Sequence, residues 1–81
     1  RLVRGQVVDA EGHPVGGVCV VLNHWHCHTD PFGYYHWSVE APEPERVTLR
    51  VYKRYSGQYE KLNETVPFSQ LVRQPIILLP R

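Results

Sequence analysis

Short runs that alternate between apolar and polar residues are the feature that most constrains the fold of this chain. Residues 46–55 are the clearest case, with Val47, Leu49 and Val51 at every second position and mostly polar residues between them. Because side chains on a β-strand point alternately to its two faces, this spacing predicts a strand with one face in the core and the other in solvent. No segment shows sustained apolar spacing of three and four residues, so no long helix is predicted.

Further strands are predicted where β-branched and aromatic residues lie between Gly, Pro, Asp and Asn. Residues 18–22 are apolar throughout, which indicates a central strand buried on both faces. Residues 34–39 follow the turn 30–33 and are predicted to form a tight hairpin with residues 23–29. In this hairpin Thr29 would pair with Tyr34, and Cys27 with His36. The other predicted elements are strands at residues 2–8, 58–62 and 74–79, and a long connection at residues 64–73 with a helical turn anchored by Phe68 and Leu71.

These strands predict an all-β fold, a single small antiparallel β-sandwich of about seven strands that spans residues 1–81. Two packed sheets are expected because neither sheet could hide its apolar face alone. A length of 81 residues suits one hydrophobic core. The apolar share of 42%, with 21% charged residues, excludes a disordered, collagen-like or coiled-coil chain.

Charge and hydropathy narrow the classes of partner. The formal net charge is +1, with acidic and basic residues spread along the sequence, so no nucleic acid partner is expected. The longest apolar runs are far short of the ~20 residues that cross a bilayer, and no membrane insertion is expected. The sequence has no Met and begins directly with a strand-like pattern, so we expect a processed product or a segment of a larger parent protein.

Two turn motifs occur in order in the first half of the chain. Residues 3–18 read V-R-G-Q-V-V-D-A-E-G-H-P-V-G-G-V, and residues 29–35 read T-D-P-F-G-Y-Y. Glycine suits positive φ, proline fixes φ, and aspartate accepts hydrogen bonds from nearby backbone amides. The turn-building residues of these types are Gly12, Gly33, Pro14, Asp9 and Asp30.

This order of a V-x-G-x-V strand, a D-x-x-G-x-P turn, a glycine-led strand start and a T-D-x-x-G-x-Y segment resembles the carboxypeptidase regulatory-like domains. Those domains are transthyretin-like, prealbumin-type β-sandwiches with Greek-key connections. The resemblance implies a non-catalytic accessory module of a larger secreted or cell-surface protein, and hence an extracellular location. The chain departs from the family in its His- and Trp-rich residues 24–37, where relatives usually carry small polar residues before the Thr-Asp pair. A particular function is expected there.

Alternate histidines suggest a metal site. His24, His26 and His28 would share one face of a strand, and imidazoles so placed can converge on Zn²⁺ or Cu²⁺. His36 would be a fourth ligand only if the hairpin register shifted by one residue. The alternative interpretation is three polar residues on the solvated face of an edge strand.

The chain has more aromatic residues than a core of this size can hide, so part of them should form an exposed binding patch. The predicted members are Trp25, Trp37, Tyr34, Tyr52 and Tyr55. Such a patch suits a protein partner, or a carbohydrate stacked on the two tryptophans. Exposed strand edges offer a further route, self-association into a homo-oligomer or a filament.

The remaining candidate sites concern modification and catalysis. Cys19 and Cys27 permit one disulfide in an oxidising compartment, or two reduced thiols. Asn63 begins an Asn-Glu-Thr acceptor pattern for N-glycosylation. The chain has no nucleophile elbow and no phosphate-binding glycine loop, so we expect no enzyme and no catalytic residue. The leading hypothesis is a non-catalytic structural or interaction module, with metal binding or carbohydrate binding as alternatives.

Overall fold

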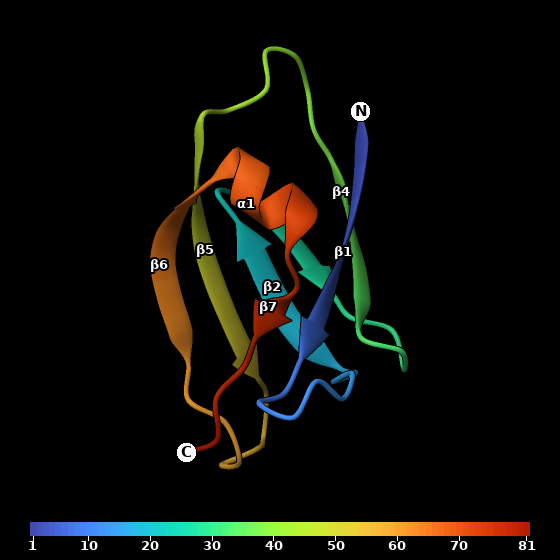
Figure 1. The fold of residues 1–81 in the computed structure, drawn as a ribbon, viewed down its shortest axis with the longest axis vertical. Coiled ribbons are helices and arrows are strands. Elements are labelled where there is room, and N and C mark those ends of the chain that lie inside the picture. The colour runs from blue at the N-terminus through green and yellow to red at the C-terminus, as the bar shows by residue number, and fades with distance from the viewer.

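The computed structural model describes all of residues 1–81 and consists of two facing sheets with one short helix (Figure 1). One sheet has three strands in the order β4-β1-β7, and the other has four in the order β3-β2-β5-β6. All pairs are antiparallel except β1 with β7. The all-β prediction is confirmed. The elements are β1 (Leu2–Val8), β2 (Val18–Leu22), β3 (Trp25–His28), β4 (Tyr34–Ser38), β5 (Arg46–Lys53), β6 (Leu62–Pro67), α1 (Phe68–Arg73) and β7 (Ile76–Ile77).

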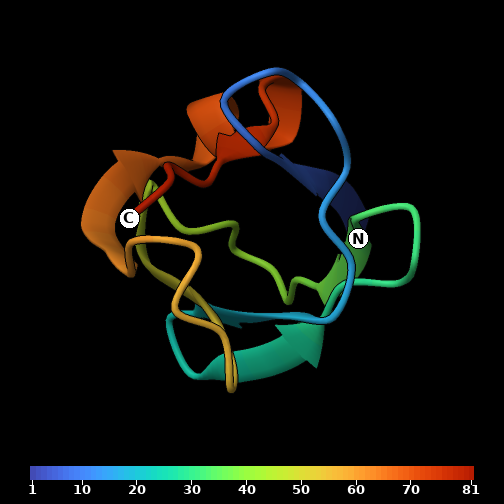
Figure 2. The ribbon, with the colours of Figure 1, turned by 90° about the horizontal axis from the view of Figure 1, so that it is seen from below.

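The hydrophobic core lies between the two sheets. Figure 2 shows β2 and β3 on one side of it and β1 with α1 on the opposite side. All five residues of β2 are buried, so the predicted central strand is confirmed. In β5 the inward Val47, Leu49 and Val51 are buried while the residues between them are exposed, as the alternation predicts. Apolar side chains from both sheets meet in one cluster of 17 residues.

The two predicted aspartate turns are confirmed. Asp9 Oδ1 accepts hydrogen bonds from the backbone N–H groups of Glu11 and His13, at 3.0 and 2.9 Å. Asp30 Oδ1 accepts hydrogen bonds from two backbone N–H groups in the same way. The glycine of each turn has positive φ, 86° at Gly12 and 81° at Gly33.

The predicted hairpin between residues 23–29 and 34–39 is wrong. β3 pairs with β2, whereas β4 pairs with β1, so the turn after Asp30 carries the chain from one sheet to the other. Tyr34 therefore lies opposite Gln6 and not Thr29, and His36 lies opposite Arg4 and not Cys27. The cause is burial: Tyr35 and Trp37 belong to the core of the three-stranded sheet, and a hairpin with the exposed β3 would leave them uncovered.

The predicted strand at residues 58–62 is also wrong, because the strand here is β6, which begins only at Leu62 and continues through residues 64–67 of the predicted connection. The inward positions of β6 are Leu62, Glu64 and Val66, and the glutamate breaks the apolar alternation that would have revealed the strand. The predicted helical turn is confirmed, since Phe68 and Leu71 are the buried residues of α1. The last strand is shorter than the predicted 74–79. The structure contains no helix with the length and apolar character needed to span a membrane.

Candidate functional site

The histidines of the predicted metal site lie on three different segments. His24 is in the turn between β2 and β3, His26 and His28 are on β3, and His36 is on β4 in the other sheet. All four side chains are exposed. They do not bring three ligand atoms within 4.8 Å of one another, the spacing that a shared metal ion requires. Zinc or copper binding by these histidines stays a prediction from the sequence.

Ligand atoms of three other residues, Asp9, Glu11 and His13, do lie within 4.8 Å of one another. The turn itself explains this cluster. The backbone N–H of His13 is the main cause that lowers the pKa of Asp9, with the N–H of Glu11 contributing. The imidazole Nδ1 of His13 lies 3.6 Å from the second carboxylate oxygen of Asp9. The carboxylate therefore serves to hold the turn.

The two tryptophans do not form a shared binding surface. Trp37 is buried in the core, where its ring meets Phe68 edge to face at 6.0 Å between centroids. Trp25 is 43% exposed, and its indole Nε1 donates a hydrogen bond of 3.3 Å to the backbone oxygen of His36. The prediction that both tryptophans bind a carbohydrate is wrong, because Trp37 is buried in the core against Phe68 of α1.

The predicted tyrosines lie apart from one another as well. Tyr34 is on β4, with the guanidinium of Arg4 over its ring at 4.0 Å. Tyr52 is on β5 in the other sheet, where the predicted glycosylation residue Asn63 also lies exposed on β6. Tyr55 is 99% exposed in the loop after β5. The prediction of one aromatic patch is therefore wrong, since its members occupy both sheets, the core and a loop.

The two cysteines are free thiols on opposite faces of the four-stranded sheet. Cys27 lies opposite Val20 and shares its face of the sheet. Cys19 is the residue next to Val20 on β2, so its side chain points to the other face, and the two sulfur atoms are separated by the sheet. Of the two alternatives that the sequence leaves open, the structure has two reduced thiols. Burial raises the pKa of the Cys27 thiol to about 11.

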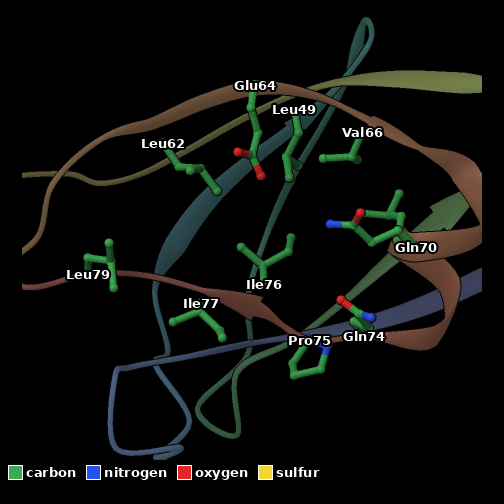
Figure 3. Close-up of a pocket in the computed structure, with 11 residues that line it drawn as sticks. Leu49, Leu62, Glu64, Val66, Gln70, Gln74, Pro75, Ile76, Ile77 and Leu79 are labelled. Carbon is green, nitrogen blue, oxygen red and sulfur yellow. The ribbon is translucent and has the colours of Figure 1, made fainter.

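A groove with a volume of about 350 Å³ lies between β6 and β7 (Figure 3). Helix α1 closes one end. At the other end the backbone N–H of Glu60 donates to the oxygen of Leu79 at 2.9 Å, which joins the last residues of the chain to the loop before β6. The lining is mainly apolar and includes Leu49, Leu62, Val66, Leu71, Ile76, Ile77 and Leu79.

Both strands that flank the groove have an unpaired edge. β6 pairs with β5 alone, and β7 pairs with β1 alone, so each strand turns one row of backbone groups away from its sheet. Two large apolar side chains of the rim remain in solvent, Ile77 at 52% and Leu79 at 56% exposed. A further β-strand can pair with such an open edge and place its side chains in the apolar cavity beside it.

Three polar side chains give the groove its chemistry. The carboxylate of Glu64 points into it among apolar side chains, and the amides of Gln70 and Gln74 lie toward the α1 end (Figure 3). Glu64 has no ion-pair partner, since the ion pairs of the chain are Arg1 with Glu43 and Asp9 with His13. Sequence reasoning missed this site, although a glutamate between Leu62 and Val66 at strand spacing was the signal.

Comparison of the sequence with models of known protein families gives no match, and neither does a search of curated proteins. The functional proposal for this chain therefore depends on its own residues.

Proposed function

We propose that this domain is a non-catalytic interaction module that binds an extended segment of a protein along the groove between β6 and β7. The observation that supports it most is the pair of unpaired strand edges beside an apolar cavity of about 350 Å³. A segment that adds to the edge of β6 gains backbone hydrogen bonds and places alternate side chains in the cavity. β6 has six residues, so the segment would be of similar length.

Glu64 would set the specificity of the groove. Its carboxylate points toward the apolar lining and has no basic partner, although the residue itself is exposed to solvent. An inward charge on an edge strand discourages pairing with an uncharged apolar strand. A lysine or arginine on the bound segment would satisfy the carboxylate through a charge-assisted hydrogen bond. The expected segment therefore alternates apolar residues and carries one basic residue among them.

The segment would come from the parent polypeptide, from another protein or from a second copy of the domain. The absence of catalysis and the location outside the cytoplasm are parts of the same proposal, and they rest on the resemblance to carboxypeptidase regulatory-like domains. Sedimentation of the isolated domain over a wide concentration range distinguishes these sources. A segment from a second copy would give dimers or longer assemblies, whereas the other two sources would leave the domain monomeric.

Selection of displayed ten-residue peptides tests the groove. We expect enriched peptides with alternating apolar residues and one Lys or Arg, and we expect a Glu64→Lys variant to enrich acidic residues at that position instead. Selected peptides should lose binding to an Ile77→Asp variant, which places a charge on the rim. A Leu2→Asp variant changes an apolar residue that is 67% exposed on β1, away from the groove lining, and should bind normally. Peptides that respond equally to both aspartate variants would contradict the proposal.

A further inference from the structure

We propose that a second surface, the outer face of the four-stranded sheet, binds a linear polysaccharide that carries carboxylate groups. We call it the cationic face and define it by Arg46, Arg50, Tyr52, Lys61, Asn63 and His26. These residues lie on β3, β5 and β6 or directly before β6, on the side of the sheet opposite the core. The proposal is independent of the groove, because Glu64 takes an inward position on β6 whereas the neighbouring Asn63 points to the opposite face.

Strand register brings these side chains together. His26, Val21, Arg50 and Asn63 lie directly opposite one another and form one row across all four strands. Tyr52 is two residues along β5, in the row of Cys19 and His28. Side chains that lie opposite each other or two positions apart on neighbouring strands share one surface. The row therefore places a guanidinium, an amide and an imidazole in line across the sheet.

The positive charge of this surface is not neutralised within the domain. Five of the nine basic residues have a partner: Arg1 pairs with Glu43, Arg4, Lys53 and Arg54 lie over tyrosine rings, and Arg73 bonds a backbone oxygen of α1. Three of the other four are Arg46, Arg50 and Lys61. No acidic residue takes an outward position on the strands of this face, because Glu64 points into the groove and the other acidic residues lie in loops and turns.

A shallow hollow of about 290 Å³ lies in the cationic face and is lined by Arg50, Tyr52, Lys61, Leu62 and Asn63. The guanidinium fork can grip a carboxylate through two hydrogen bonds, and the lysine ammonium adds a second positive charge. The half-buried ring of Tyr52 offers a flat surface to the apolar face of a sugar, and the amide of Asn63 can bond its hydroxyl groups. The hollow thus combines the groups that an acidic sugar needs.

Arg46 adds another positive charge to the cationic face, further along β5 from Arg50. It lies four residues from Arg50 on the same face, which corresponds to roughly 13 Å along a strand. Thr48 lies between the two arginines, opposite Thr65 of β6. Cations spaced along a strand with hydroxyl groups between them suit a ligand whose own charges and hydroxyl groups repeat.

Two other polyanions fit less well. Nucleic acid binding draws on many phosphate contacts and on several stacked aromatic side chains, whereas this face has three permanent charges and one tyrosine. A folded acidic protein would need an apolar centre for its interface. The large apolar side chains that are exposed on this domain, such as Leu2, Phe32 and Ile77, lie outside the cationic face.

Binding to polygalacturonate tests the proposal with the whole 81-residue chain. We expect calorimetry at low salt to show binding that weakens as salt rises, and no binding to the fully methyl-esterified polymer, which lacks the carboxylates. The triple variant Arg46→Gln, Arg50→Gln, Lys61→Gln should bind at least about tenfold more weakly, because the charges that attract the polymer are gone. The triple variant Arg54→Gln, Arg73→Gln, Arg81→Gln removes the same number of charges elsewhere and should bind within about twofold of the wild type.

A second pair of variants separates the specific site from general charge. Tyr52→Ala should weaken binding, whereas Tyr55→Ala, which removes a ring that is 99% exposed in the loop, should not. Circular dichroism and thermal melting would establish that all variants are folded. Equal losses in the two triple variants would overturn the proposal, and so would tighter binding to polyglutamate or to single-stranded oligo-dT than to polygalacturonate.

Discussion

At the scale of single residues, Gly5 and Tyr35 decide how the three-stranded sheet packs. They lie opposite each other on β1 and β4, and the ring of Tyr35 crosses the space where any other residue at position 5 would have its Cβ. A Cβ built on Gly5 would overlap the Cζ, Oη and Cε1 atoms of Tyr35. The ring is 1% exposed, so it cannot swing into solvent without leaving the core.

The Gly5→Ala variant should therefore be destabilised. We expect a loss of about 1–3 kcal/mol in the free energy of unfolding, the usual cost of overpacking a core. Urea denaturation would measure it. The matched control is Gly57→Ala, because a Cβ at Gly57 meets nothing within 4 Å, and its stability should change by no more than about 0.5 kcal/mol. Equal stability of the two variants would show that Tyr35 adapts.

Cys27 makes stability depend on alkaline pH. Burial raises its pKa from 9.0 to about 11, so the thiolate forms in the unfolded chain before it forms in the folded one. The stabilisation is complete below pH 9 and is lost as the pH rises through 11. Urea midpoints between pH 8 and 11 should fall more steeply for the wild type than for Cys27→Val. Tyr35 adds to the fall in both proteins, because burial raises its pKa as well. Parallel curves would contradict the assignment to Cys27.

At the scale of elements, the sequence predicts the strands whose pattern is local and misses those whose partner is distant. β2 and β5 follow from their apolar spacing alone, because each is buried by neighbours on both sides. The partner of β4 cannot be predicted from local spacing. The short turn before β4 suggests a hairpin with β3, whereas the burial of Tyr35 and Trp37 requires that β4 pair with β1. β6 was not predicted because Glu64 takes an inward position and interrupts the apolar alternation of the strand.

Helix α1 is expected to depend on one aromatic contact. Phe68 packs against Trp37 and beneath the guanidinium of Arg1, at 6.0 and 5.7 Å between group centres. Phe68→Ala should cost about 3–5 kcal/mol of stability, as for other large core truncations. Phe32 is 67% exposed at the turn after Asp30, and Phe32→Ala should be nearly neutral. Thermal melting of both variants would make the comparison, and similar melting temperatures would place Phe68 outside the cooperative core.

At the scale of the whole molecule, the architecture could be predicted but the candidate sites could not. Alternation along one strand says which side chains share a face, so the histidines of β3 were found. It does not say which strands lie beside that face, and neither the groove nor the cationic face exists until β5 and β6 are paired. Arg50 and Asn63 lie opposite each other only because of the loop that connects β5 to β6. No local pattern in the sequence predicts this register.

The ends of the described chain have a mechanical consequence. Residues 1 and 81 lie at opposite ends of the long axis, while β1 and β7 run side by side in the same direction (Figure 1). A pull between these ends would slide β1 along β7 and stretch all of their hydrogen bonds at once instead of opening them one at a time. Joined in series within a longer polypeptide, the domain would therefore meet tension first at this short parallel contact of two residue pairs.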